Sequence, residues 1–172
     1  MSSTAAASAG SSGAVPFRMN HTMYRIRDPA VSLPFYTEQC GMSVLWRMDV
    51  PSLKFTNYFL GYNAPADISS WSDADKQKFV FQQSGVIELC HNWGTEEKDE
   101  SPYHNGNKEP QGFGHICLVV DDVKAATQRF KDRGVKIVKE PDSGSLKGIA
   151  FIADPDNYWI ELVPALGGLE LK

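Results

Sequence analysis

Two histidines and two glutamates in matching sequence surroundings could hold a divalent metal ion. His21 opens the segment H-T-M-Y-R-I-R-D and His115 opens H-I-C-L-V-V-D-D, while Glu88 and Glu161 each stand at the centre of an I-E-L triplet. Two imidazoles and two carboxylates suit Zn²⁺, Ni²⁺, Co²⁺ or Mn²⁺, and they lack the thiolates of a closed structural zinc site. The sequence therefore predicts a metal-dependent enzyme.

The four residues occupy equivalent places in an internal repeat. The offset of 94 residues between His21 and His115 (115 − 21) also relates Asp28 to Asp122. From histidine to glutamate the first copy spans 67 residues (88 − 21) and the second 46 (161 − 115), an excess of 21 in the first. We expect most of this excess in a polar surface loop over residues 63–78, where an insertion costs little. Any two strand–helix units share some periodicity, but matching ligand types at matching places favour duplicated modules.

Hydrophobic periodicity predicts the elements that carry these residues. The first module is expected to contain a strand, a helix and three strands, over residues 21–27, 29–39, 43–48, 54–60 and 79–89. Pro34 should kink the helix because proline lacks an amide hydrogen. The second module is expected to repeat this order, with strands over residues 115–120, 135–139, 149–153 and 158–163 and a helix between Asp122 and Gly134. The predicted fold class is therefore α+β.

Composition indicates an ordinary globular protein with small-molecule or protein partners. A chain of 172 residues with 42% hydrophobic content can bury a core. The formal net charge of −4, with scattered Lys and Arg, argues against nucleic acid or an anionic membrane as partner. Three cysteines without C-x-x-C spacing favour a reducing compartment, so we expect a cytoplasmic location. Residues 1–15, rich in Ser, Ala and Gly, are expected to form a disordered tail.

Six motifs resemble the glyoxalase I (lactoylglutathione lyase) family of the vicinal oxygen chelate superfamily, in its long eukaryotic form. They are T-M-Y-R-I-R-D-P, K-F-T-N-Y-F-L-G-Y, I-E-L-C-H-N-W-G-T-E, Y-H-N-G-N, G-F-G-H-I and A-F-I-A-D-P-D-N-Y-W-I-E. The resemblance implies two βαβββ modules, residues 16–110 and 111–172, which form a cupped mixed sheet in one glyoxalase-type domain. It also implies a homodimer with intersubunit active sites, where His21 and Glu88 of one chain face His115 and Glu161 of the other.

The same resemblance implies an activity and a set of substrate contacts. Members isomerise the hemithioacetal of methylglyoxal and glutathione to S-D-lactoylglutathione, with one divalent metal ion per site and glutathione as co-substrate. Glu161 is expected to be the principal base, and Glu88 a ligand and second proton carrier. The remaining expected contacts are polar partners for glutathione, Arg25, Asn92, Lys139 and Gln111, and apolar pocket residues, Phe55, Phe59, Leu146 and Trp159.

Three residues depart from the family pattern. His21 stands where long-form, zinc-dependent members place Gln, whereas His there is typical of the short class activated by nickel or cobalt, so zinc and nickel both stay open. Gln111 stands where Arg is common, which removes a charged partner of the glycine carboxylate. Asn57 replaces an apolar pocket residue, which should shift the aldehyde preference.

Two other functions fit the same residues. A non-catalytic metal- or thiol-binding member of the superfamily would keep the fold, but four intact ligand residues speak against it. An oxygen-using dioxygenase on the related fold would hold iron with two His and one carboxylate and leave open positions, whereas here a fourth ligand is present. Thiol-dependent turnover would separate the glyoxalase activity from that of a dioxygenase.

Overall fold

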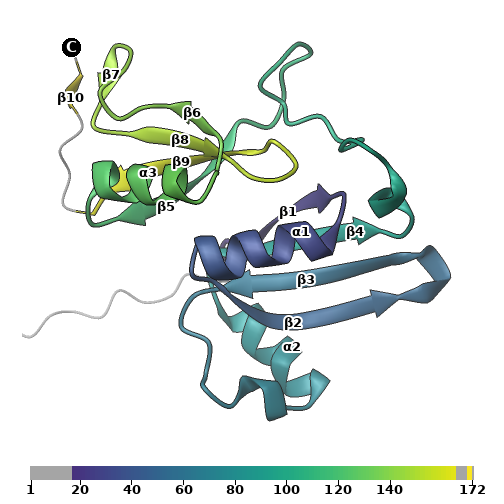
Figure 1. Ribbon diagram of the computed structural model, residues 1–172. Coiled ribbons are helices and arrows are strands. Elements are labelled where there is room, and N and C mark those ends of the chain that lie inside the picture. The colour runs from purple at the N-terminus through teal and green to yellow at the C-terminus, as the bar shows by residue number, and fades with distance from the viewer. Residues whose placement is uncertain (1–16, 166–169, 172) are drawn as a thin grey trace, which may run out of the picture.

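The computed structural model describes residues 17–165 and 170–171, which form two similar modules (Figure 1). The predicted tail over residues 1–15 lies outside the described residues. The first module contains β1 (His21–Ile26), α1 (Pro29–Pro34), β2 (Ser43–Val50), β3 (Phe55–Gly61), α2 (Asp73–Gln82) and β4 (Val86–Asn92). The second contains β5 (His115–Val120), α3 (Val123–Asp132), β6 (Ile137–Lys139), β7 (Leu146–Lys147), β8 (Ala150–Ala153), β9 (Trp159–Pro164) and β10 (Glu170–Leu171).

Each module builds one four-stranded mixed sheet of the same topology. The strand orders are β1-β4-β3-β2 and β5-β9-β8-β6, and in each sheet the first two strands of this order, β1 with β4 and β5 with β9, lie parallel. The remaining two strands of each sheet pair antiparallel, and β7 and β10 form a separate two-stranded pair that the sequence analysis did not predict. The predicted α+β fold with two βαβββ modules is confirmed. Among the described residues, the strands of one chain form these two four-stranded sheets and the β7–β10 pair.

The first helix changes its hydrogen bonding where proline interrupts it. Asp28 caps its N-terminus, since its side chain accepts from the Ala30 amide at 2.8 Å, and Pro29 is the first residue of the helix. After Pro34 the chain continues as a π-helix over Phe35–Gln39. Pro34 has no amide hydrogen to donate, so the regular α-helical pattern cannot pass through it. The interruption at Pro34 therefore takes the form of a change in hydrogen bonding, and the predicted kink stays a prediction.

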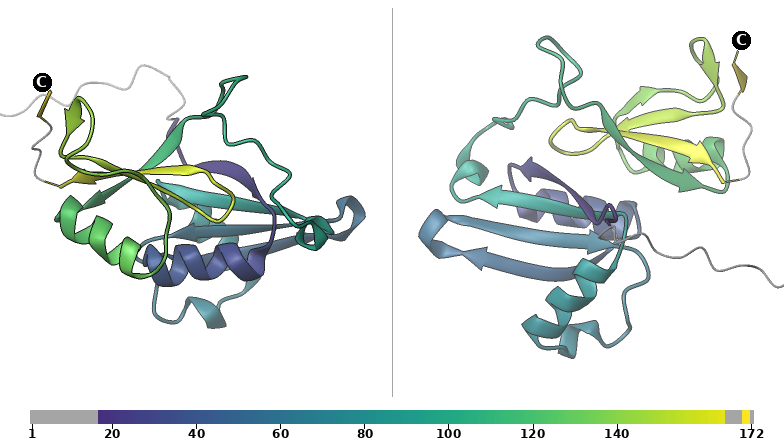
Figure 2. Two further views of the ribbon diagram at one scale, coloured as in Figure 1. Left: turned by 45° about the horizontal axis from the view of Figure 1, so that its top comes forward. Right: turned by 180° about the vertical axis from the view of Figure 1, so that it is seen from behind.

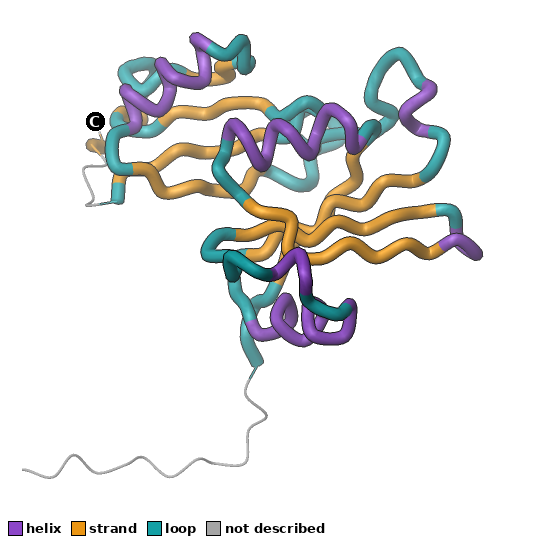
Figure 3. The backbone as a smooth tube through the Cα atoms, turned by 60° about the horizontal axis from the view of Figure 1, so that its bottom comes forward, coloured by secondary structure: helices purple, strands orange, loops and turns teal. Residues whose placement is uncertain are grey.

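The prediction for residues 63–89 is wrong in part. The polar stretch was expected to be a loop and residues 79–89 a strand, but Asp73–Gln82 form helix α2 and β4 begins only at Val86. The Ser72 side chain accepts from the Asp75 amide at 3.2 Å, and two aspartates lie in the first turn, where the helix dipole favours negative charge. Figure 3 shows α1 and α2 on opposite sides of the first sheet, so the inserted helix covers the face that α1 leaves open.

A shared core joins the two modules. Tyr24 and Tyr36 of the first module pack with Tyr158 of the second, and the rings of Tyr24 and Tyr158 lie 4.9 Å apart. Helices α1 and α3 lie on the same side of the molecule (Figure 2), and Arg129 of α3 donates to the Gln39 carbonyl at 2.7 Å. In the described part of the chain, no helix is both long and apolar enough to span a membrane.

The Asp154 carboxyl is buried beside this shared core, and its raised pKa gives the fold a testable pH dependence. It is 4% exposed, and the Tyr36 hydroxyl and the amides of Asp156 and Tyr158 donate to it at 2.8–2.9 Å. Burial raises the pKa of Asp154 to about 7, and these hydrogen bonds oppose the shift. The folded state therefore holds the proton more tightly than the unfolded chain, in which the carboxyl titrates near 3.8.

We expect the free energy of unfolding to fall as pH rises from about 4 to about 7, by up to about 4 kcal/mol from Asp154. Asp154→Asn should lose most of this dependence because the amide does not ionise. Urea unfolding at pH 5 and pH 8 measures it, with Asp121→Asn, which removes an exposed carboxyl of the same module, as the control. Equal pH slopes for wild type and Asp154→Asn would contradict the prediction.

Candidate active site

His21 and Glu88 form a preorganised pair on adjacent parallel strands. The Nε2 atom of His21 lies 2.9 Å from Oε2 of Glu88, and its Nδ1 lies 2.7 Å from Oδ1 of Asn20. Asn20 is itself fixed, because its amide donates to the carbonyls of Val80 and Gln83 at 2.9 and 2.8 Å. One ring nitrogen of His21 is therefore anchored on Asn20, and the other, Nε2, faces Glu88, which is the nitrogen that would bind a metal ion.

His115 and Glu161 form the equivalent pair in the second module, with fewer partners. Their Nε2 and Oε2 atoms lie 3.4 Å apart, and the His115 ring meets the edge of Phe151 at a centroid distance of 5.1 Å. Burial raises the pKa of the neighbouring Cys117 thiol to about 11, and the charge of Glu161 adds to the shift. This pair is therefore held more loosely than the first.

The two pairs do not meet within one chain. Among the described residues, no group of three or more His, Cys, Asp or Glu side chains lies close enough to hold a metal ion. The donor chemistry of each pair, one imidazole and one carboxylate, fits half of a four-ligand centre for a late transition metal. The predicted set of four ligands stays a prediction that needs a second chain.

The predicted contacts of the first module gather on the face of His21 and Glu88. Strand alternation places Arg25 on this face, and the register puts Phe59 opposite Glu88 and Phe55 opposite Asn92. The Asn92 amide donates to the Tyr103 hydroxyl at 3.1 Å. Among the described residues, no hydrogen bond or ion pair joins the guanidinium of Arg25 to another side chain.

The predicted contacts of the second module are more scattered. In the strand register, Trp159 lies opposite His115. Lys139 of β6 lies opposite Phe151 of β8, and Phe151 in turn lies opposite Glu161 of β9. The Lys139 ammonium already donates to the carbonyls of Glu140 and Ile149 at 3.1 and 2.9 Å. Leu146 lies in the separate β7–β10 pair and Gln111 in the segment before β5. In the described part of the chain, no hydrogen bond joins either side chain to His115 or Glu161.

An aromatic wall beside His21 includes residues that the sequence analysis missed. Phe59 stacks on Trp46 at 5.1 Å, and its ring lies 5.8 Å from the His21 ring and 6.2 Å from Phe81 of α2. Phe81 was overlooked because its segment was predicted as a strand. The Ser72 cap followed by two acidic residues was the signal that could have revealed the helix.

Glu88 has a second partner, Asn57, on the neighbouring strand β3. The Asn57 amide donates to Oε1 of Glu88, while Oε2 faces His21. Burial raises the pKa of the Glu88 carboxyl, and the charge of His21 and the hydrogen bond from Asn57 oppose the shift. Asn57 thus contacts a predicted metal ligand, a role that the sequence analysis did not foresee.

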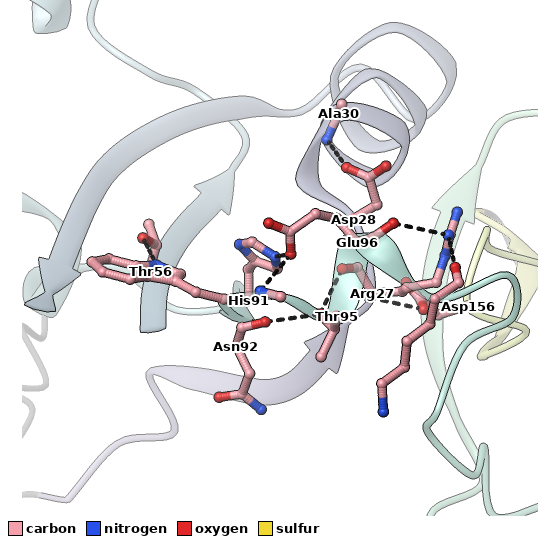
Figure 4. A network of polar contacts seen from close by, with 12 residues as sticks. Arg27, Asp28, Ala30, Thr56, His91, Asn92, Thr95, Glu96 and Asp156 are labelled. Atoms are coloured by element: carbon pink, nitrogen blue, oxygen red, sulfur yellow. Dashed lines mark hydrogen bonds and ion pairs between the residues drawn. The ribbon is translucent and has the colours of Figure 1, made fainter. Parts of the chain in front are cut away.

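His91 lies outside the candidate site. Its Nε2 atom lies 2.7 Å from Oε2 of Glu96, in a polar network at the end of β4 (Figure 4). In the same network the Thr95 hydroxyl donates to the Arg27 carbonyl at 2.7 Å, and the Arg27 amide donates to Asp156 at 3.0 Å. The network fixes the loop after Asn92 and ties the first module to the second.

Comparison with known proteins agrees with this geometry. Residues 18–162 match the model of the Glyoxalase/Bleomycin resistance protein/Dioxygenase superfamily. The chain belongs to this superfamily. A lactoylglutathione lyase of Pseudomonas aeruginosa is 47% identical over 146 residues, covering 85% of this chain and 81% of that protein. A glyoxalase I of Saccharomyces cerevisiae is 45% identical, covering 84% of this chain and 44% of its own length.

Solved structures give the same result. The trypanothione-dependent glyoxalase I of Leishmania major superposes with a TM-score of 0.62 at 37% identity, covering 87% of each chain. Glyoxalase I of Zea mays gives a TM-score of 0.62 at 34% identity, covering 85% of this chain and 44% of that one. The chain spans about half the length of these maize and yeast relatives. The predicted family, glyoxalase I, is thereby confirmed.

Proposed function

We propose that the protein is a lactoylglutathione lyase. It converts the hemithioacetal of methylglyoxal and glutathione into S-D-lactoylglutathione and so removes methylglyoxal. The observation that carries this proposal is the pair of equivalent His–Glu half-sites, each on adjacent parallel strands of its module. Relatives at 43–47% identity that are named lactoylglutathione lyase or glyoxalase I support the same activity.

Four ligands fit one divalent ion, with His21 and Glu88 from one chain and His115 and Glu161 from its partner. Such an ion would supply Lewis acid stabilisation of the negative charge that develops on the substrate oxygens. The His21 imidazole favours nickel or cobalt, whereas the length of the first module favours zinc. The hydrogen bond from Asn20 to His21 supports a ligand role, because metal-binding histidines commonly anchor their second nitrogen in this way.

The reaction moves one proton between neighbouring carbons of the substrate. The Glu161 carboxylate accepts the proton of the C1–H bond and becomes a carboxylic acid. The electron pair of that bond enters the enediolate. The proton of the C1 hydroxyl passes to the C2 oxygen of the enediolate, and the same carboxyl returns its proton to C2. C1 thereby becomes the thioester carbonyl carbon and C2 the alcohol carbon, so atoms and charge balance. Glu161 suits this task because its 3.4 Å contact with His115 is easily broken, while Glu88 stays in place.

The remaining contacts bind the glutathione part of the substrate. Arg25 and Asn92 take the γ-glutamyl end, and Lys139, after releasing its two carbonyl partners, takes the glycine carboxylate. Exposed apolar side chains near both half-sites, Met23 and Val119, support a homodimer that covers them. Three free cysteines support a reducing, cytoplasmic location.

The test is thioester formation by metal-stripped protein refilled separately with Zn²⁺, Ni²⁺ or Co²⁺. We expect product from methylglyoxal and glutathione with at least one metal, and the order of rates ranks the metals. Tight metal binding without product would instead support a non-catalytic metal- or thiol-binding protein. Oxygen consumption without a requirement for thiol would support a dioxygenase.

Gln111→Arg should strengthen binding of the glutathione hemithioacetal. An arginine there adds a charge-assisted hydrogen bond to the glycine carboxylate, of about 1.5–3 kcal/mol. The Michaelis constant should therefore fall about 10-fold or more with kcat nearly constant, as steady-state kinetics would measure. Gln111→Met, which has similar length and no charge, is the control without this gain. An unchanged Michaelis constant in Gln111→Arg would contradict the prediction.

A further inference from the structure

Glu88 and Glu161 occupy equivalent places in the repeat but have different surroundings. Both oxygens of Glu88 have partners, since Oε2 lies 2.9 Å from His21 and Oε1 accepts from Asn57. Glu161 has the 3.4 Å contact with His115 and the Cys117 thiol, which is a weak donor. One carboxylate is therefore clamped from two strands, and the other is not.

The strand registers identify the residue that causes this difference. Phe59 lies opposite Glu88, and Phe151 lies opposite Glu161. Two residues earlier, on the same face, the first module has Asn57 and the second has Ile149. Both positions are buried, with exposed fractions of 7% and 1%. An aliphatic side chain evidently satisfies the packing at this position, so the amide is not required to fill space.

The amide of Asn57 also carries a cost. Its Oδ1 atom is buried and has no hydrogen-bond partner among the described residues. An unpaired buried acceptor is unfavourable, and an aliphatic residue would avoid the penalty. The interaction that remains to account for Asn57 is its donation to Glu88.

The two hydrogen-bonded contacts of Glu88 matter for the reaction because the substrate has two stereochemical forms. Addition of a thiol to the aldehyde makes C1 a stereocentre, so the hemithioacetal exists as two epimers. With the two substrate oxygens held in one position, the epimers direct the C1–H bond toward opposite sides. The two carboxylates come from different sheets. In the proposed four-ligand centre we assign one glutamate to each side of C1. A glutamate must leave its partners to accept the proton, and a clamped one does so with greater difficulty.

We propose that Asn57 is a positioning residue that keeps Glu88 in its ligand position, so that Glu161 alone carries the proton and only one epimer reacts directly. The inference rests on the proposed function. The other epimer reacts only after it dissociates to aldehyde and thiol and forms again in solution. The polar residue at position 57 thus sets the stereochemical selectivity of the site.

Single-turnover kinetics test the clamp, with metal-loaded enzyme in excess over preformed hemithioacetal. Wild type should form product in two phases, and the rate of the slow phase should not depend on enzyme concentration, because free epimers interconvert without the enzyme. Asn57→Ile, which copies the residue of the second module, should release Glu88 and turn the slow phase into an enzyme-dependent one. Asn57→Gln, which keeps the amide, should retain the wild-type behaviour at least in part.

A second measurement does not depend on turnover. Loss of an outer partner of a metal ligand weakens metal affinity by about 10-fold or more, so Asn57→Ile should raise the metal dissociation constant by this factor in a chelator competition. The reciprocal variant Ile149→Asn, if folded by circular dichroism, should slow the fast phase. A single enzyme-dependent phase in wild type, or an Asn57→Ile protein with wild-type kinetics and metal affinity, would overturn the proposal. Absence of product from wild type with every metal would instead count against the proposed function, and the metal affinities would still decide whether Asn57 supports Glu88.

Discussion

Replacing Glu161 with Gln should lower kcat/KM for the glutathione hemithioacetal by about 10²–10⁴-fold. The amide has nearly the shape of the carboxylate, but it cannot accept the proton from C1. Glutamine remains a neutral oxygen ligand, so part of the metal affinity should survive. The measurement is the rate of thioester formation at saturating metal, with the metal content of the variant determined in parallel.

Glu88→Gln is the matched control because it makes the same change at the equivalent place of the repeat. With Glu88 clamped by Asn57 and His21, its main role is to hold the ion. We expect weaker metal binding and a smaller loss of kcat once the metal is saturating. A larger loss in Glu88→Gln than in Glu161→Gln would exchange the roles assigned to the two carboxylates.

Local sequence signals were sufficient for most of the fold. Asp28 followed by Pro29 marks a helix start through capping and the fixed φ of proline, and the same cap type at Asp122 begins α3. The stretch around Val80 misled the prediction, because a short run of consecutive apolar residues, here Phe79, Val80 and Phe81, is also compatible with a buried strand. Only Val80 of these three is fully buried, as expected for a helix with one side against the sheet.

The sequence predicted those residues of the candidate site that have a counterpart in the other copy of the repeat, and it did not predict the others. His21, Glu88, His115 and Glu161 could be found because each has a counterpart at the same place of the other copy. Contacts that depend on neighbouring strands, such as Asn57 with Glu88, require the register of the sheet, which one strand's alternation does not contain. The same holds for the distance between the two half-sites, since it depends on how whole modules pack.

Because the two half-sites lie apart within one chain, two inactive variants that each lack a different half-site should complement each other. A chain with His21→Ala and Glu88→Ala lacks the first half-site, and a chain with His115→Ala and Glu161→Ala lacks the second. Each alone should be inactive, because every site of its homodimer lacks two ligands. In a dimer with twofold symmetry, a mixed pair of these chains should contain one complete site and one site without any of the four ligands.

Coexpression of the two variants under different affinity tags should therefore restore activity from near zero. Random pairing makes about half of the dimers mixed, each with one of its two sites complete, so about a quarter of wild-type activity should return, and about half in dimers purified through both tags. The control pairs the first variant with a chain that carries all four substitutions, a mixture in which no arrangement completes a site. Sites formed within single chains would give no restoration in either mixture, because neither variant contains four ligands of its own. Recovery in the first mixture alone would require that His21 and Glu88 of one chain act together with His115 and Glu161 of the other.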